Sequence, residues 1–409
     1  MSSATTTTYD PVLKYLYPQE RVENLVYDGA PLLAMLPKAN DFYGKALVLA
    51  LQYGNPQGTT ATFAKAQSNA LPSSMEDFIL TRKRHYSVAT LETELIEASK
   101  NDKGALVDAL KNEMDGAFAQ LGRRWHSGLY GNGGGAIGRV TTGGTGTSFT
   151  LTSIEDVANF EIGQEIVFST ADGTSGSLKA GSVTVTGVNR DTGVITVDAM
   201  SAIASGSGTA NNDYVFIDGD FGAMFTGLAG WIPTTAPTST AFFGVDRSVD
   251  TVRLGGCRYD GSGDADKQAA LINGLTKLAR QGAKARPDAV FMNVVDFGDL
   301  IVELDAKVQY EQTRVNGGKA TIGFDSVELH SPAGTVKVIA DFQCPKGRAY
   351  ALKLSTWKWH GLGDGIGIIK TDGLSMIRQA SADGVEFRLA VRGQLGCTAP
   401  GWNCVISLP

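Results

Sequence analysis

The sequence predicts an α+β protein that carries an extra all-β domain in the middle of the chain. Three observations support this class: one long helical pattern over 102–130, short alternating segments within 139–217, and helices mixed with strands after residue 218. A chain of 409 residues with 43% hydrophobic and 19% charged side chains can bury the cores of two or three domains.

Residues 1–44 are expected to form an N-terminal arm. Its short apolar runs are interrupted by Pro11, Pro18, Pro31 and Pro37. Proline at this density excludes a long helix, because each ring removes a backbone donor and clashes with the preceding turn. We therefore expect an extended segment that lies on another surface.

Two strand-like stretches, 45–53 and 81–96, flank a long polar connection. The first is rich in Leu and Val, and the second alternates apolar with polar residues. The connection, 54–76, is much longer than a turn, and such segments usually serve as binding loops or protruding arms. We expect 45–96 to form an extended two-stranded finger.

The clearest local pattern is the helix predicted over 102–130. Its large apolar residues recur at steps of three or four and share one helical face: Leu106, Leu110, Met114, Phe118, Leu121, Trp125 and Leu129. Asp102 is a candidate N-cap, and Gly128 or Gly131 can end the helix. At 1.5 Å per residue the helix spans roughly 40 Å, which exceeds what a small core needs.

The predicted all-β module differs in composition from the rest of the chain. Residues 139–217 contain 33 Gly, Ser or Thr among 79 positions, and strands are expected at 149–152, 183–188 and 194–197. The module has 3 basic and 8 acidic residues, which leaves 33 basic and 34 acidic residues elsewhere. Most of the net charge of −6 is therefore concentrated in this module.

The second half of the chain is predicted to mix helices and strands. An amphipathic helix is expected over 265–281, a buried strand over 289–292, and a second helix through Phe297, Leu300, Ile301 and Leu304. The last expected strands are 386–392 and 405–408.

The usual chemical motifs point to no catalytic, cofactor or metal site. Gly133, Gly135 and Gly138 match G-x-G-x-x-G, but here the motif follows a helix and opens a β module, the reverse of a dinucleotide site, so we expect a flexible hinge. The carboxylates of 260–266 lack the glycine and glutamate positions of a calcium loop, and a solvated loop ending in an N-cap is expected. The four histidines are far apart in sequence.

Charge, cysteines and hydropathy exclude further classes. A net charge of −6 argues against a protein whose main role is to bind the phosphate backbone of nucleic acids. We find no membrane span and no secretory signal, so folding in a cytoplasm is expected. Cys397 and Cys404 are the nearest cysteine pair, and free thiols are favoured there over a disulfide. The basic run 82–85 is interpreted either as a solvated strand face or as a contact between repeated subunits.

The order of these segments resembles the major capsid protein of tailed bacteriophages, whose HK97-like shell fold is shared with encapsulins. The matching stretches are RVENLVYDGAPLLAMLP at 21–37, GLAGWIP at 227–233, PDAVFMN at 287–293, GVEFR at 384–388 and GQLGCTAPG at 393–401. The likeness covers nearly the whole chain except the all-β module.

The resemblance implies six regions. They are the N-terminal arm (1–44), the E-loop with its flanking strands (45–96), the spine helix and peripheral domain (97–138), the inserted β domain (139–217), the axial domain (218–344), and peripheral-domain strands with C-terminal axial strands (345–409).

By the same resemblance, the protein is expected to assemble with itself. Pentamers and hexamers would build an icosahedral shell around the double-stranded DNA of a tailed phage, in the bacterial cytoplasm and without sequence-specific DNA binding. The expected partners are a scaffolding protein, a portal and a decoration protein. A helix that starts near Asp102 leaves no room for an N-terminal scaffolding segment, so the scaffold is expected to be separate.

The sequence is also compatible with three other classes of protein. The first is an encapsulin-like protein compartment, which would hold protein cargo in place of DNA. The second is a β-rich surface or adhesion protein, suggested by the Gly/Thr-rich module. The third is an enzyme with a β substrate-binding module, for which no nucleophile, base or metal set is found.

Overall fold

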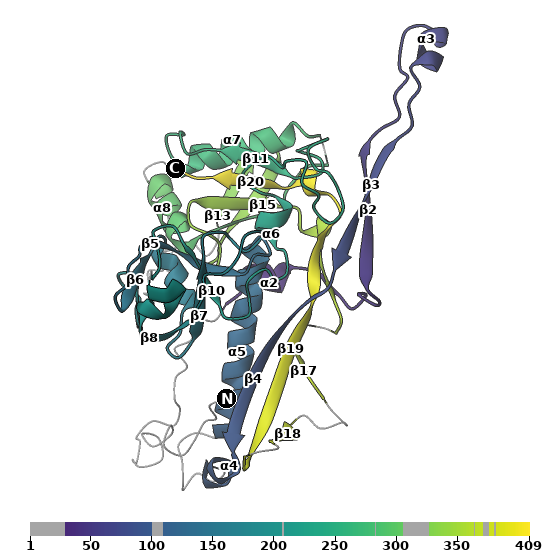
Figure 1. Cartoon of the computed structure of the whole chain (residues 1–409). Helices are drawn as coiled ribbons and strands as arrows, with labels where there is room; N and C mark the ends of the chain where they lie inside the picture. Colours follow the sequence, from purple (N-terminus) through teal and green to yellow (C-terminus); the bar gives the residue numbers. More distant parts are fainter. Residues whose placement is uncertain are drawn as a thin grey trace, which may run out of the picture.

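The computed structural model describes residues 29–99, 109–206, 208–282, 284–305, 327–363, 365–370, 376–379 and 382–409. Figure 1 shows a central sheet with helices packed on it, a β-barrel beside it, a long strand ribbon lined by a helix, and a hairpin that projects far from the body. In the described part of the chain, no helix has the length and hydropathy needed to cross a membrane.

Helix α5 (Ala109–Tyr130) is the predicted long helix. Leu121, Trp125 and Leu129 on its apolar face are buried against the core, as the spacing predicts. The expected N-cap Asp102 and the first apolar position, Leu106, lie outside the described residues.

Helix α5 packs along a ribbon made of β4 (Lys83–Glu92) and β19 (Gly384–Cys397). The two strands are antiparallel and pair from Lys83 opposite Gly393 to Glu92 opposite Gly384. The predicted strand 81–96 therefore ends at Glu92, and the chain continues into helix α4 (Thr93–Ser99), so this part of the prediction is wrong. Strand β19 is twice as long as the predicted segment 386–392 because it spans the whole ribbon.

The projecting hairpin consists of β2 (Ala46–Gly54) and β3 (Ser74–Thr81), which form a two-stranded antiparallel sheet. The sequence prediction paired 45–53 with 81–96, and the structure corrects the second strand to β3. Glu76 and Asp77 make the start of β3 look like a polar loop, although Phe78 and Leu80 alternate inward. The short helix α3 (Phe63–Ser68) lies at the hairpin tip.

The central sheet has the strand order β11-β20-β15-β12-β14-β13. Helices α7 and α8 pack on it, and Asp266 caps α7 by accepting a hydrogen bond from the Ala269 amide, as predicted for the end of that acidic loop. The bounds are β11 Cys257–Asp260, α7 Lys267–Ala279, β12 Ala289–Met292, α8 Val294–Asp305, β13 Val327–Ser331, β14 Gly334–Ala340, β15 Arg348–Leu352 and β20 Cys404–Ser407.

Residues 136–217 form a closed six-stranded barrel in the order β10-β5-β6-β9-β8-β7. The three strands expected there are present as β6, β8 and β9. The bounds are β5 Ala136–Thr142, β6 Ser148–Leu151, η1 Ile154–Asn159, β7 Glu165–Ser169, β8 Val183–Asn189, β9 Val194–Val197, η2 Met200–Gly206 and β10 Tyr214–Ile217.

The remaining short elements join the ribbon sheet or connect the parts. Strand β1 of the arm pairs in parallel with β16, so the described part of the arm is tied to the ribbon sheet. Their bounds are α2 Pro31–Met35, β1 Lys38–Ala39, α6 Leu228–Trp231, η3 Leu354–Thr356, β16 Trp357–Gly361, β17 Gly367–Ile368, β18 Met376–Arg378 and η4 Pro400–Trp402.

The glycine-rich segment before the barrel is packed and is not a free hinge. The Gly131 carbonyl accepts a hydrogen bond from the Gly227 amide, and the Gly134 carbonyl accepts one from Gly222. A Cβ at Gly135, which has φ +88°, would lie 2.3 Å from the Asp220 carbonyl oxygen. These glycines let the entry and exit segments of the barrel cross in direct contact.

A buried polar cluster joins α5 to the central sheet. The Tyr130 hydroxyl donates to Asp341 Oδ2 at 2.8 Å, and His126 Nε2 lies 2.8 Å from the same oxygen. Burial, together with the Asp341 charge, raises the pKa of Tyr130 well above its usual value. Since all three side chains are buried, this cluster fixes where the long helix lies against the sheet.

The four cysteines, Cys257, Cys344, Cys397 and Cys404, are buried free thiols. Burial raises the pKa of the Cys397 thiol to about 12, which keeps it protonated and unreactive. The expectation that Cys397 and Cys404 are unbonded is confirmed.

Candidate assembly surfaces

The projecting hairpin exposes large apolar side chains. Phe63 in the tip is 83% exposed and Leu71, at the other side of the tip, is 62% exposed. Val48 and Ile79 face each other across the two strands and are also exposed. Exposed apolar patches on one element mark an interaction surface.

The root of the hairpin is held firmly by the body. Phe78 and Leu80 are fully buried, and the ring of Phe78 packs edge-on against Trp231 at 5.1 Å between centroids. The Arg253 guanidinium donates to the Tyr53 carbonyl at 2.6 Å. The hairpin is therefore a fixed arm with a free tip.

The basic run at the root of the hairpin is used mostly within the chain. Arg82 donates to the Phe42 carbonyl and Lys83 to the Gly222 carbonyl, each at 3.0 Å. His85 lies 3.6 Å from Asp220, and burial lowers the pKa of this histidine. Arg82 and Arg84 are exposed, whereas Lys83 and His85 are partly buried, so a contact between subunits at this run stays a prediction.

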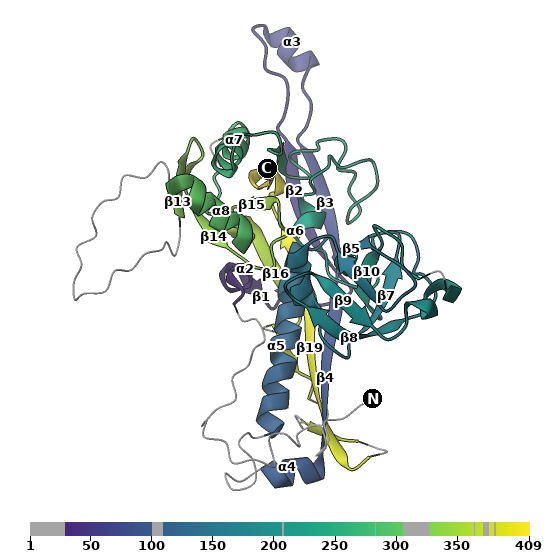
Figure 2. The same ribbon diagram turned by 90° about the vertical axis from the view of Figure 1, so that its left-hand side faces the viewer.

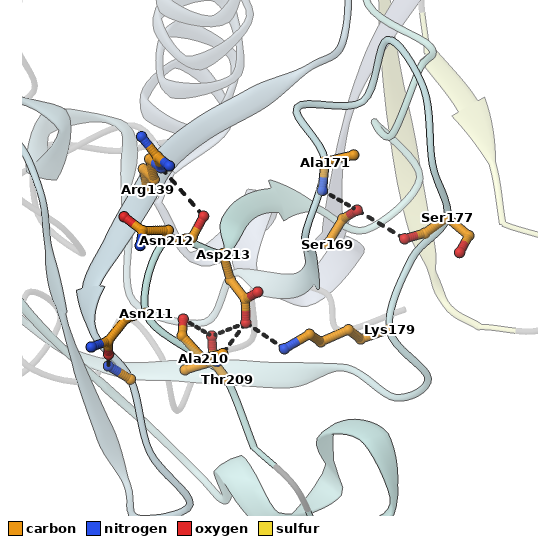
Figure 3. A network of polar contacts seen from close by, with 11 residues as sticks. Arg139, Ser169, Ala171, Ser177, Lys179, Thr209, Ala210, Asn211, Asn212 and Asp213 are labelled. Atoms are coloured by element: carbon orange, nitrogen blue, oxygen red, sulfur yellow. Dashed lines mark hydrogen bonds and ion pairs between the residues drawn. The ribbon is translucent and has the colours of Figure 1, made fainter.

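A polar network around Asp213, shown in Figure 3, lies at the start of β10 in the barrel. The Asp213 carboxylate is buried and accepts hydrogen bonds from Lys179 Nζ at 2.5 Å, the Thr209 hydroxyl at 2.8 Å and the Ala210 amide at 2.5 Å. Nearby, the Ser169 hydroxyl donates to the Ser177 carbonyl at 2.8 Å. The network holds two barrel loops to the start of β10.

Replacing Asp213 with Ala is expected to destabilise the barrel by about 3 kcal/mol, because the ammonium, hydroxyl and amide donors would lose their common acceptor. Thermal unfolding and hydrogen exchange of the barrel strands measure the effect. Asp191→Ala, at an exposed hairpin turn, is the matched control and should be neutral. Equal melting temperatures for the two variants would show that the network does not stabilise the barrel.

Ion pairs connect the barrel to the body, and small cavities lie along the boundary between them. Arg123 of α5 reaches Glu161 of the barrel at 2.7 Å. Arg124 binds both ends of the barrel insertion, since it donates to Asp220 at 2.7 Å and to the Gly135 carbonyl at 2.8 Å. Cavities of about 210 and 270 Å³ lie on this boundary. The contact is polar, which suits a separate domain that is held in one orientation.

Asp156 lies on this boundary and makes stability depend on pH. Burial, with the adjacent Glu155, raises the pKa of Asp156 to about 7. Between about pH 4 and 7 the folded chain keeps a proton that the unfolded chain has released, so this group lowers stability as pH rises through that window.

We expect Asp156→Asn to be more stable than the unmodified protein by about 1–2 kcal/mol at pH 8, and equal to it near pH 4. Melting curves across this pH range measure the difference. A difference that is the same at pH 4 and pH 8 would contradict the assignment.

In the described ranges no three His, Cys, Asp or Glu side chains gather to hold a metal ion. The histidines are used structurally: His126 in the Asp341 cluster, and His360 with its Nδ1 at 2.8 Å from Asp41. The absence of catalytic and cofactor residues stays a prediction.

The fold is similar to that of chains in solved capsid structures. A chain of the cyanophage A-1(L) capsid aligns with 13% identity and a TM-score of 0.56 over 96% of each chain. A capsid chain of the native GTA particle aligns with 10% identity and a TM-score of 0.51 over 97% of this chain and 95% of its own. A chain of the holo-SrpI encapsulin complex from Synechococcus elongatus aligns with 8% identity and a TM-score of 0.46, over 100% of this chain and 96% of its own.

The resemblance to tailed-phage capsid proteins is thus confirmed for the fold, and the chain has the HK97-like capsid fold over nearly its whole length. No family model and no curated protein matches the sequence.

Proposed function

We propose that the protein is the major capsid protein of a tailed phage, which assembles as pentamers and hexamers into an icosahedral shell around double-stranded DNA. The observation that carries this proposal is a capsid fold with a rigidly rooted, apolar-tipped hairpin that projects from the body. A hairpin of this kind gains stability when another copy covers it.

The six regions follow from this proposal with one adjustment. The E-loop is the hairpin 46–81, because β4 belongs to the ribbon. Helix α5 is the spine helix, the barrel is the inserted domain, and the central sheet is the axial domain. Residues 345–409 supply strands to both sheets, since β15 and β20 join the central sheet while β16 and β19 join the ribbon.

The charge distribution suits a wall around DNA. Outside the β module 33 basic residues nearly balance 34 acidic ones, so the wall would not trap DNA through a large net positive charge. In this proposal the protein is structural and carries no catalytic site, assembles in the bacterial cytoplasm, and works with a separate scaffolding protein, a portal and a decoration protein.

Electron microscopy of the purified protein, alone and with candidate scaffolds, tests the proposal. Closed shells or five- and six-fold rings are the expected result. Nuclease-protected DNA in particles from infected cells would favour the phage capsid, and packaged protein without DNA would favour an encapsulin-like compartment. A monomer under all conditions would contradict both.

A further inference from the structure

One end of the central sheet carries a basic, aromatic cleft. Lys353 Nζ lies 4.7 Å and Lys284 Nζ 6.0 Å from the ring centroid of Trp402. Lys284 and Trp402, with Arg253 and the hairpin root, line a cleft of about 350 Å³. Lys353 lies beside it and donates a hydrogen bond from Nζ to the Lys284 carbonyl at 2.8 Å. Exposed Arg280, at the C-terminus of α7, adds charge to this end.

The acidic residues near the cleft do not balance these cations. Asp250 lies 3.7 Å from Arg253 Nε, and Asp288 accepts a hydrogen bond from the Leu354 amide. This end therefore has two carboxylates and four cationic side chains, which gives it an excess of positive charge. The cations are Arg253, Arg280, Lys284 and Lys353. We name this surface the basic end.

The opposite end of the sheet is acidic and apolar. Helix α8 exposes Val294, Val295 and Val302, of which Val302 is 73% exposed. Asp299 lies on the same side of this helix as Val295 and Val302, because these positions are four and three residues apart. Asp260, at the C-terminal end of the edge strand β11, is also exposed at this end of the strands.

Among the described residues, most bases at this end are buried or paired within the chain. Lys346, which is exposed, lies 3.3 Å from Glu155 of the barrel. Lys267 is buried and pairs with both Asp296 at 2.9 Å and Asp299 at 2.5 Å. Arg348, at the start of β15, is partly buried. We name the surface formed by α8 and Asp260 the acidic end.

The two ends lie too far apart to meet within one chain. Helix α7 starts beside α8, where Lys267 contacts Asp299, and finishes at Ala279 near the basic end. Its 13 residues span about 20 Å. Figure 1 shows α8 and the hairpin root on opposite sides of the sheet.

We infer that the acidic end of one copy binds the basic end of the next, with the exposed valines of α8 against Trp402 and its carboxylates against Lys284, Lys353 and Arg280. This contact rests on the proposed function, because it supplies the joint between neighbouring axial domains in a ring. Each copy donates one end and accepts with the other, which is a head-to-tail contact that closes into rings. Opposite charges would set the register of the contact.

A second copy fits the observations better than a nucleic acid does. Phosphates would satisfy the cations of the basic end but would leave the valines of α8 exposed. A neighbouring copy covers both surfaces at once, and Trp402 offers an apolar counterpart to the valines.

Charge reversal tests the contact. One variant carries Arg280→Glu with Lys284→Glu. A second carries Asp260→Arg with Glu303→Arg; Glu303 lies one helical turn after Asp299 on α8 and accepts a hydrogen bond from the Gln268 amide at 3.3 Å. A third variant combines all four changes. Each two-residue variant alone is expected to associate at least about tenfold more weakly than the unmodified protein in sedimentation velocity. Their mixture and the four-residue variant should regain association, since opposite charges again meet.

Lys370→Glu with Asp191→Arg, at exposed positions after β17 of the ribbon sheet and on the barrel, is the control and should change nothing. Circular dichroism confirms that each variant folds. Recovery in the mixture supports the contact even if no closed shell forms, so its outcome is separate from that of the proposed function. Variants that associate like the unmodified protein, or a four-residue variant that stays monomeric while the control associates, would overturn it. Lost binding to a labelled DNA duplex without lost self-association would assign the basic end to nucleic acid instead.

Discussion

Deleting residues 57–72 is expected to give a folded subunit that no longer assembles. The deletion removes α3 and the exposed Phe63 and Leu71, and leaves Asn55, Pro56 and Ser73 to join β2 to β3. A three-residue connection is a common hairpin loop, and the buried root of the hairpin is untouched. Fold should persist because the tip makes no contact with the core, while the surface that another copy would cover is lost.

Circular dichroism and melting curves should match those of the unmodified protein, and electron microscopy should show no rings or shells. Ile162→Ser on the barrel is the control, because Ile162 is 71% exposed and lies away from the hairpin. Loss of assembly in that control, or intact shells from the deletion variant, would refute the hairpin as the intersubunit arm.

Leu121→Asp is expected to abolish folding of the subunit. Leu121 is 2% exposed on the face of α5 that packs against the ribbon, so the substitution buries a carboxylate with no partner. Such a change costs more than about 4 kcal/mol, which is a large part of the stability of a typical domain. We expect insoluble protein, or soluble protein without a cooperative thermal transition.

Gln120→Asp places the same carboxylate one position earlier, on the exposed side of the helix beside Arg123. This variant should fold and assemble normally, which separates the effect of burial from the effect of an acid in the helix. Normal solubility and melting of Leu121→Asp would show that this face of α5 is not part of the core.

The periodic elements were predictable because their pattern is local. Leu121, Trp125 and Leu129 share one face of α5 whatever surrounds the helix, because the helical repeat alone sets their positions. The four residues of β12 are all apolar, as expected for a central strand that is buried on both faces. The N-cap at Asp266 was also predictable from local sequence, because its side chain accepts a hydrogen bond from an amide only three residues away.

Strand partners were not predictable in the same way. The pattern of 81–96 indicates a strand, but its partner β19 lies about three hundred residues further along the chain. The predicted polar connection 54–76 covers the start of β3, and the next four residues are assigned to no element. Only pairing with β2 reveals this strand. The periodicity of a sequence can predict a strand, but it does not indicate which other strand will form hydrogen bonds with it.

The sequence by itself determined the long helix, the position of the β module, the order of segments and, through that order, the capsid fold. Only the tertiary structure decided which strands pair, how Arg124 holds the two ends of the barrel insertion, and that Trp402 and α8 lie on opposite ends of one sheet. The physical reason is that side-chain spacing encodes which face of an element is apolar. The surface that covers this face depends on chain segments brought together only by folding.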